Sequence, residues 1–254
     1  MWFNEAAIAP YFLRHYSFAD RIHILVDVDT TDATRELCDA TPGVTWSSHA
    51  FPDMLDDEIK AASLTRTVTE LAGEYDWIVV VDADELVFAR SGIHNLRAVL
   101  VQQSPDVDVL WVPMWQVYRH AKSEKPLDPD GDEPVLQRRH GEACVHHVKA
   151  AIVRPEAGVI LGPGCHSYAQ RGHALGSGVK YVPAVSAVWA DSPIIGAHWP
   201  MVDEEMAVDR YLRCRRERLS KANLQRRHGV HYLSMTEASV REECRAHAND
   251  LRLW

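Results

Sequence analysis

Apolar and polar positions along the first part of the chain alternate between strand-like runs and helix-like spacing. Residues 21–27 read as a strand that ends on Asp27, and residues 31–40 follow with the hydroxyl and carboxylate side chains that commonly begin a helix. Residues 77–81 form an apolar run, which predicts a strand buried on both faces of a parallel sheet. Strands that alternate with helices indicate an α/β fold.

The rest of the chain extends this pattern and then changes to helices alone. Residues 119–141 have no apolar period, so we expect a long loop there. Because helical spacing dominates from Asp203 onward, residues 1–202 are expected to form one sheet-based domain and residues 203–254 a C-terminal helical extension packed on it. Other expected elements are helices over residues 8–15 and 93–103, a helix that carries Leu64, Val68 and Leu71, and strands over residues 44–47, 107–117 and 149–155.

Length, charge and cysteines narrow the class of protein. At 254 residues the chain can bury a substantial core, and its net charge of −9 argues against a nucleic acid as the main partner. The five cysteines include no Cys-x-x-Cys pair, which favours a reducing cytoplasm. The sequence has neither a secretory signal nor an apolar run of the ~20 residues that span a bilayer. We therefore expect a cytoplasmic protein without a transmembrane segment.

Three acidic residues, Asp82, Asp84 and Glu85, directly follow the apolar run of residues 77–81. Open α/β sheets place their ligand crevice at the carboxyl ends of strands. Two carboxylates separated by one residue can share a Mn²⁺ or Mg²⁺ ion, to which a substrate diphosphate supplies further oxygen ligands. The alternative is that the acidic residues only end a strand and cap a helix.

Other polar residues lie where they could join such a site. Asp27 ends its own predicted strand, where its carboxylate could accept a hydrogen bond from a nucleobase or a ribose. His166 follows a glycine-rich turn and His198 lies in Ala-His-Trp-Pro, so either could complete the coordination of a metal. By contrast, His15 continues an apolar helix face and is expected in the core, and Lys60 is expected on a solvated helix face.

The extension beyond Asp203 is rich in arginine. Its apolar positions, which include Tyr211 and Leu212, share one helical face, and its basic residues lie elsewhere. This arrangement favours a solvated amphipathic helix. A basic amphipathic helix could alternatively make a peripheral contact with an anionic membrane or bind a phosphorylated acceptor. The basic residues are Arg210, Arg213, Arg215, Arg216, Arg218, Lys221, Arg226 and Arg227.

Three separated segments together resemble a known family. They are Asn4-Glu5, residues 26–32 and residues 76–85, in this order along the chain. They resemble the family-2-like glycosyltransferases with a GT-A fold, and the resemblance continues through residues 149–155 and the two histidine turns. The fold it implies is Rossmann-like, with a mixed but mostly parallel sheet flanked by helices.

The resemblance also implies roles for individual residues. Asp84 would bind a Mn²⁺ or Mg²⁺ ion together with Asp82 and with His166. His198 is the second choice for the histidine ligand. The residues that the resemblance implies in nucleotide binding are Glu5, Asp27, Asp82 and Lys149.

The function implied is transfer of a sugar, of the hexosyl or N-acetylhexosaminyl class, from a nucleotide-diphosphate sugar to an acceptor hydroxyl or amine. A UDP-sugar is the favoured donor, and the acceptor would be a small natural product or a polysaccharide or lipid-linked sugar. Inversion at the sugar is the favoured outcome, and it needs a carboxylate that removes the acceptor's proton. Asp132 and Glu133 in the long loop are the candidates for this base.

Two other functions compete with this one. A non-catalytic nucleotide-sugar-binding domain would keep the fold without a base, and it would bind the nucleotide without turning over the donor. An aspartate-nucleophile phosphatase would use Asp82 as the nucleophile and Asp84 as the general acid and base. Such enzymes usually carry this motif near the start of the chain, whereas here it begins at position 82.

Overall fold

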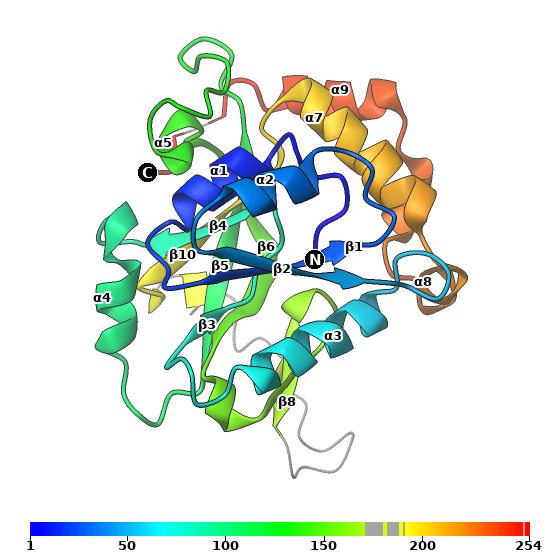
Figure 1. Ribbon diagram of the computed structural model, residues 1–254. Helices are drawn as coiled ribbons and strands as arrows, with labels where there is room; N and C mark the ends of the chain where they lie inside the picture. Colours follow the sequence, from blue (N-terminus) through cyan, green and yellow to red (C-terminus); the bar gives the residue numbers. More distant parts are fainter. Residues whose placement is uncertain (171–179, 182–187, 190, 251) are drawn as a thin grey trace.

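The computed structural model describes residues 1–170, 180–181, 188–189, 191–250 and 252–254. Helices lie on both sides of the strands, so the chain has the α/β architecture that the sequence predicts (Figure 1). The described strands form sheets of two, five and three members.

The five-stranded sheet has the strand order β3-β6-β5-β10-β4. Only β5 and β10 pair in parallel, and the other three neighbouring pairs are antiparallel. The expected mostly parallel sheet is therefore wrong. Parallel neighbours need long, usually helical, crossovers, whereas the second half of the chain joins its strands mainly through loops and short helical turns. The strands are β3 (Ile78–Val79), β4 (Glu85–Ala89), β5 (Val109–Tyr118), β6 (His140–Val153) and β10 (Ile194–Met201).

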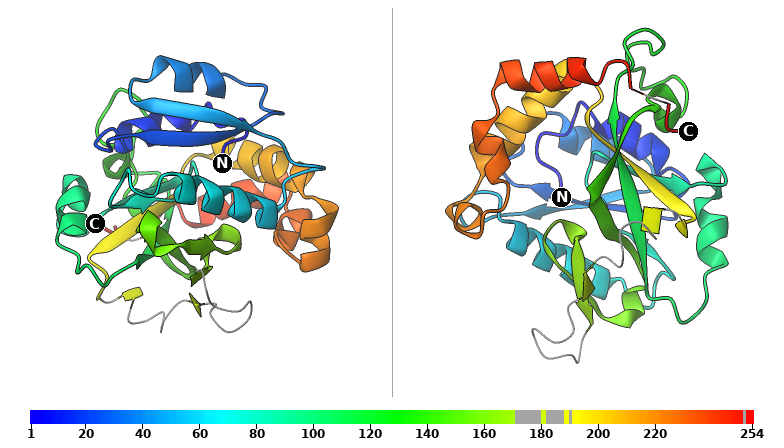
Figure 2. Two further views of the ribbon diagram at one scale, coloured as in Figure 1. Left: turned by 60° about the horizontal axis from the view of Figure 1, so that its bottom comes forward. Right: turned by 180° about the vertical axis from the view of Figure 1, so that it is seen from behind.

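β1 and β2 form a separate two-stranded parallel sheet. Helix α2 lies over one face of this pair and helix α3 over the other, as two views show (Figures 1 and 2). The side chain of Asp56 caps α3 by accepting hydrogen bonds from the first backbone N–H groups of the helix, which fixes where the helix begins. These elements are β1 (Ile22–Asp27), α2 (Thr34–Ala40), β2 (Val44–His49) and α3 (Asp57–Glu70).

β3 differs from the strand expected over residues 77–81. It is a short strand that pairs only with β6, in antiparallel, at the edge of the five-stranded sheet. Val79 is only half-buried, although Val80 is buried. The expectation of a strand buried on both faces of a parallel sheet is therefore wrong, because β3 has no second strand neighbour in the described part of the chain.

The three-stranded sheet packs beneath α3, where Val68 contacts a buried cluster that includes Val159 and Tyr168. The long loop expected over residues 119–141 contains the short helix α5, and its last residues already belong to β6. The elements not yet given are η1 (Ile93–Asn95), α4 (Leu96–Val101), α5 (Pro134–Gln137), η2 (Pro155–Ala157), β7 (Val159–Leu161), η3 (Pro163–Cys165), β8 (Ser167–Gln170) and β9 (Lys180–Tyr181).

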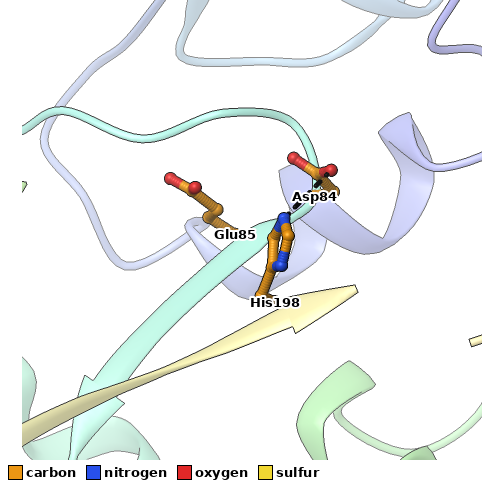
Figure 3. A group of neighbouring side chains, drawn as sticks. All are labelled: Asp84, Glu85 and His198. Atoms are coloured by element: carbon orange, nitrogen blue, oxygen red, sulfur yellow. Dashed lines mark ion pairs between the residues drawn. The ribbon is translucent and has the colours of Figure 1, made fainter. Parts of the chain in front are cut away.

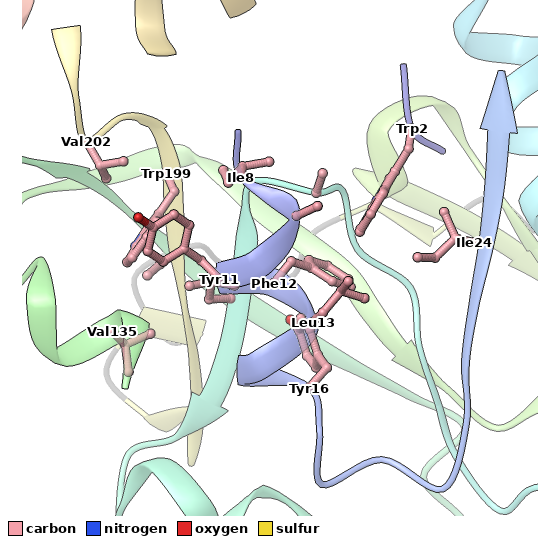
Figure 4. Packing of buried hydrophobic residues seen from close by; sticks show 14 of the residues in the cluster. Trp2, Ile8, Tyr11, Phe12, Leu13, Tyr16, Ile24, Val135, Trp199 and Val202 are labelled. Carbon is pink, nitrogen blue, oxygen red and sulfur yellow. The ribbon is translucent and has the colours of Figure 1, made fainter. Parts of the chain in front are cut away.

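Helix α1 (Ala9–His15) lies in the middle of the main core (Figure 4). Tyr11 packs toward Trp199 of β10, with ring centroids 5.9 Å apart. Phe12 packs edge-on toward Trp2, with ring centroids 5.1 Å apart. Burial of each such side chain contributes about 1.5–3 kcal/mol. The helix thereby joins the two-stranded sheet to the five-stranded sheet.

His15 at the end of α1 is a core residue, as its helical spacing predicts. It is 4% exposed, and its Nε2–H donates a hydrogen bond to the carbonyl of Val87 at 2.9 Å. Burial lowers the pKa of His15 to about 4 despite this backbone hydrogen bond. The imidazole is therefore neutral in the folded protein.

From Glu204 to Ala246 the chain forms short helices that pack on the ends of β5 and β10. Tyr118 and Met201 from these strands cluster with Tyr211 and Val240 of the extension. Helices α7 and α9 lie side by side (Figure 2). The helices are α7 (Glu204–Val208), the π-helix η4 (Asp209–Arg215), the 3-10 helix η5 (Arg216–Arg218), α8 (Lys221–Arg226), η6 (Val230–Ser234) and α9 (Glu237–Ala246).

The arginine-rich face of the extension is not uniformly solvated. Arg213 is exposed, but Arg210 and Arg218 are 8% and 7% exposed. The expectation of a solvated face is wrong at these two positions, because both side chains pair with carboxylates from distant parts of the chain. Every helix that the structure describes is too short or too polar to cross a lipid bilayer.

Candidate functional site

The acidic motif forms a turn between β3 and β4. The carbonyl of Asp82 accepts a hydrogen bond from the backbone N–H of Glu85 at 3.1 Å. In return, Oε2 of Glu85 accepts one from the backbone N–H of Asp82 at 3.0 Å. Glu85 is also the first residue of β4 and is 1% exposed. These paired hydrogen bonds fix the turn that carries the carboxylates of Asp82 and Asp84.

Two lysines approach the carboxylate of Asp82 from different elements. Nζ of Lys60, on α3, lies 2.5 Å from Oδ1, and Nζ of Lys149, on β6, lies 3.6 Å from Oδ2. Lys149 also forms an ion pair with Glu85. Burial alone would raise the pKa of Asp82, but the two ammonium groups hold it well below its usual range. Asp82 is therefore ionised, and the expectation that Lys60 lies on a solvated helix face is wrong.

Asp84 is paired with an arginine from the C-terminal extension. Nε of Arg210 donates a hydrogen bond to Oδ2 of Asp84 at 2.7 Å, and the same guanidinium pairs with Glu5. Burial would raise the pKa of Asp84, but Arg210 and the neighbouring His198 hold it well below its usual range. The other oxygen of Asp84, Oδ1, is buried and has no hydrogen-bond partner among the described residues.

His198 faces Asp84 from the neighbouring strand β10. Its Nε2 lies 3.6 Å from Oδ2 of Asp84, and its Nδ1 lies 2.8 Å from Oε1 of Gln116 on β5. Gln116 and His198 are opposite each other in the parallel pairing of β5 with β10. Because an amide oxygen only accepts, Nδ1 carries a hydrogen in this arrangement, and Nε2 is the ring nitrogen that faces Asp84. A partner on the far nitrogen orients a histidine in this way when it binds a metal.

Asp84, Glu85 and His198 each offer a ligand atom within 4.8 Å of the others (Figure 3). The two oxygens of Glu85 already bind Lys149 and the backbone N–H of Asp82. Oδ1 of Asp84 has no partner among the described residues, so Asp84 could bind a metal through this oxygen and His198 through Nε2. One carboxylate and one imidazole, with further oxygens from a ligand, suit Mn²⁺ or Mg²⁺. The donor set therefore fits the ion that the sequence predicts.

Asp27 lies at the end of β1 beneath an arginine of the extension. A terminal nitrogen of Arg218 lies 2.9 Å from Oδ2 of Asp27 and 3.4 Å from Oδ2 of Asp29. The Arg218 guanidinium also stacks over the ring of Phe3 at 3.6 Å. Only about 20 Å³ of cavity remains in this part of the crevice, whose lining includes Glu5, Asp27 and Arg218. The extension thus covers the carboxylate that the sequence assigns to the nucleobase.

The ring of His147 lies between those of two other histidines, His198 and His166. The ring of His147, on β6, lies edge-on to that of His198, with centroids 4.6 Å apart. On the other side, the ring of His166 stacks toward His147 at 6.2 Å. Burial lowers the pKa of His147 to about 3, and the adjacent His198 and Lys149 act in the same direction. His198 is therefore the histidine next to Asp84, and His166 is separated from it by His147.

The structure gathers most of the residues that the sequence singles out. Glu5, Asp84 and His198 lie in one set of ion pairs around Arg210. Asp82 and Lys149 lie in a second set with Lys60 and Glu85, and the turn that carries Asp82 and Asp84 joins the two sets. Asp27 lies at the neighbouring strand end, under the same C-terminal segment.

Among the described residues, the two candidate bases belong to neither set of ion pairs. Asp132 is exposed, and its carbonyl accepts a hydrogen bond from Gln137. In the described part of the chain, neither Asp132 nor Glu133 forms a side-chain hydrogen bond or ion pair with any site residue. Their role as the catalytic base stays a prediction.

Several site residues carry only weak signals in the sequence, or none. His147 is two positions before Lys149, and residues two apart on a strand share a face, so strand alternation could have found it. Gln116 could have been found only by knowing that β5 pairs with β10. Arg210 and Arg218 have no local signal, because their partners lie more than a hundred residues away.

The site is thus a buried, nearly balanced network of carboxylates and cations, in which Asp84 has one unpartnered oxygen among the described residues and lies next to an oriented imidazole. Comparison of the chain with protein-family models and with curated proteins finds no match.

Proposed function

We propose that this protein is a metal-dependent glycosyltransferase, which transfers a sugar from a nucleotide-diphosphate sugar, with a UDP-sugar favoured, to an acceptor hydroxyl or amine. The observation that carries the proposal is the arrangement at Asp84. Its Oδ1 is buried and has no hydrogen-bond partner among the described residues, and its Oδ2 lies 3.6 Å from the Nε2 of His198, whose other nitrogen is held by Gln116. This arrangement supports a divalent ion held by Asp84 and His198.

The surrounding charges support a ligand that brings both metal and anion. Lys60, Lys149 and Arg210 already pair with the carboxylates of the cluster, so its charge is nearly balanced. A divalent ion alone would add uncompensated positive charge to a buried site, which is costly. A metal diphosphate adds cation and anion together, and lysine and arginine are the side chains that bind phosphate oxygens best. Metal and nucleotide are therefore expected to bind cooperatively.

The same residues account for how the chain would act on a donor. Lys60 and Lys149 would orient the diphosphate and neutralise the charge that grows on it as the sugar leaves. The bound metal would act there as a Lewis acid. Asp27 and Phe3 would line the nucleoside side of the crevice, and Arg218, which stacks on Phe3 and pairs with Asp27, would have to yield its place.

A non-catalytic nucleotide-sugar-binding domain is the second candidate. It is favoured by the position of the two predicted bases, because Asp132 and Glu133 make no contact with the cluster among the described residues. The two candidates agree on nucleotide binding and differ only in turnover of the donor.

The phosphatase alternative fits the site less well. In that reaction Asp84 would donate and accept a proton, and a general acid works best with a pKa near the working pH. Arg210 and His198 instead hold the pKa of Asp84 well below its usual range against the effect of burial. An aspartate that stays ionised is suited to binding a cation.

The proposal is tested by thermal unfolding with Mn²⁺ alone, with a nucleoside diphosphate alone and with both. We expect a small effect from either ligand alone and a large one from UDP with Mn²⁺. A ligand present at ~100 times its dissociation constant adds about 2.7 kcal/mol to the free energy of unfolding. The Asp84→Asn variant should lose the joint effect. Glu70→Gln is the matched control, since Glu70 is exposed and, within the described part of the chain, its one ion pair is with Arg66, at 4.0 Å on the same helix.

If no nucleoside diphosphate stabilises the wild-type protein in the presence of Mn²⁺, the glycosyltransferase proposal is wrong. If binding is found, slow hydrolysis of the matching nucleotide sugar separates the two candidates. An enzyme releases free sugar in the presence of metal, and Asp84→Asn abolishes the release. A non-catalytic domain protects the nucleotide sugar unchanged.

A further inference from the structure

A partly open cavity of about 510 Å³ lies between the two-stranded sheet and the five-stranded sheet. On one side it is lined by four consecutive residues of β1, 22–25, and on the other by residues 76–81 around β3. Alternate residues of a strand point to opposite faces of a sheet. A cavity lined by consecutive residues on both sides therefore faces two strand edges rather than two sheet faces.

The hydrogen bonds of β1 confirm that it presents an edge to this cavity. The backbone N–H of Ile22 donates to Gly43 on the side of β2. On the opposite edge, β1 forms hydrogen bonds with Trp2. The backbone N–H of Trp2 donates to the carbonyl of Leu25 at 2.8 Å, and the carbonyl of Trp2 accepts from the backbone N–H of Asp27 at 2.8 Å. Because the direction of backbone groups alternates along a strand, the N–H groups of His23 and Leu25 point toward the cavity.

β3 presents the facing edge. The backbone N–H of Val80 donates to the carbonyl of Ala151 on β6 at 2.7 Å. By the same alternation, the backbone groups of Val79 and Val81 point away from β6 and toward the cavity. Unpaired backbone groups that are removed from water cost free energy comparable to a lost hydrogen bond. Two such edges that face each other are a site for another strand.

The walls of the cavity suit an apolar strand. Leu64 and Val68 of α3 line it from one side, and Tyr16 and Phe18, at and beyond the end of α1, also line it. A strand between them would be covered on both faces, as strands in the middle of an α/β sheet are. A small apolar ligand would fill the volume but would leave the two rows of backbone groups unpaired.

The pairing of Trp2 with β1 gives the direction in which a strand in this cavity would run. Trp2 forms a parallel bridge with Val26, on the edge of β1 that faces the cavity. Both Met1 and Trp2 line the cavity. Chain that continued this ladder beyond Met1 would pass alongside Ile24 and Ile22 and so would run the length of the slot.

We propose that this slot binds one further β-strand, an apolar segment of the same polypeptide joined to the amino end of Met1 and parallel to β1. The strand lies between β1 and β3 and merges the two-stranded and five-stranded sheets into one continuous sheet. An isolated two-stranded sheet is at best marginally stable, so the merger adds to the support that β1 and β2 receive from the helices packed on them. It also leads into Glu5, which belongs to the same site as Asp82 in the turn after β3.

The test fuses a six-residue extension, Thr-Val-Ile-Val-Val-Thr, to Met1 of the full chain and follows amide hydrogen exchange. The length matches β1, which has six residues. We expect exchange to slow at least tenfold in segments 22–27 and 76–81 and the melting temperature to rise. The matched control replaces the two central residues of the extension with proline, which cannot pair on both edges, and should leave both segments as they are in the parent.

Two outcomes overturn the proposal. In the first, segments 22–27 and 76–81 exchange at the parent rate in the extended protein. In the second, sedimentation shows that the parent is a dimer in which these segments are already protected, so that a second copy fills the slot. The apolar dye ANS gives an independent readout: the parent should bind it, the extended protein should not, and equal binding by both contradicts the proposal.

Discussion

Nε of Arg210 donates a hydrogen bond to Oδ2 of Asp84 at 2.7 Å across a sequence separation of 126 residues. The same guanidinium reaches Glu5, so one side chain of the C-terminal extension joins the first turn of the chain to the acidic motif. The extension is therefore part of the site rather than a covering appended to a finished domain.

Removal of Arg210 should be strongly destabilising. The Arg210→Met variant keeps most of the side-chain volume but leaves the buried carboxylates of Glu5 and Asp84 without their shared cation. Breaking a buried ion pair by removing one partner costs about 3–5 kcal/mol. Urea denaturation should show a loss of this size in the free energy of unfolding.

The control for this variant is Arg213→Met. Arg213 pairs with Asp209 on the surface of the same helix, with side chains that are 74% and 44% exposed. An exposed pair of this kind contributes about 0–1 kcal/mol. If both variants lose the same free energy of unfolding, the buried ion pairs of Arg210 do not stabilise the fold more than an exposed pair does.

The hydrogen bond between Gln116 and His198 should set the affinity for metal. The Gln116→Leu variant removes the acceptor that orients the imidazole without touching Asp84. Loss of such a supporting partner typically weakens metal binding by about 10–100-fold. We expect this drop in Mn²⁺ affinity, measured by electron paramagnetic resonance in the presence of UDP. Gln103→Leu is the control and should bind Mn²⁺ like the wild type, because the side-chain amide of Gln103 donates to the carbonyl of Val99 on its own helix end, away from the site.

His15 should make the fold sensitive to mild acid. Burial lowers its pKa from 6.5 to about 4, so the unfolded chain takes up a proton at a higher pH than the folded protein. Its contribution is fully present above pH 6.5 and is lost as the pH falls toward 4. The loss amounts to about 3 kcal/mol, at 1.36 kcal/mol per pKa unit.

The free energies of unfolding of the wild type and of His15→Gln should therefore converge as the pH is lowered from 6.5 to 4. The amide of glutamine can still donate to Val87, so the variant removes the titration and keeps a donor. If the difference between the two free energies of unfolding stays constant over this range, His15 is not the residue that makes the fold sensitive to acid.

Gly141 should tolerate no side chain. A Cβ at this position would lie 2.0 Å from the carbonyl oxygen of Gln116, so β6 and β5 would have to separate next to the site. We expect Gly141→Ala to lower the free energy of unfolding by about 3 kcal/mol or more. Gly43→Ala is the control: Gly43 has φ +79° but open space around it, so backbone strain alone of about 1–2 kcal/mol is expected. A smaller loss for Gly141→Ala than for Gly43→Ala would contradict the clash.

Local patterns in the sequence predict much of the fold. The apolar runs before Asp27 and Asp82 and the helical spacing of α1 and α3 specify elements that the structure contains. Such patterns succeed because a strand or helix must turn its apolar side chains toward a core, and that periodicity is written in neighbouring residues. The same reasoning singles out the carboxylates that follow these runs, and their role as ligands stays a prediction.

The pairing of strands and the partners of the charges were decided by the tertiary structure. Nothing near Lys60, Arg210 or Arg218 indicates that each is buried against a carboxylate, since those carboxylates come from distant segments. The antiparallel pairings of the large sheet likewise depend on how the connections return across it. The sequence by itself determined which elements and acidic groups exist. Packing decided which of them meet, because burial and ion pairing are satisfied by contacts in space and leave no periodic mark along the chain.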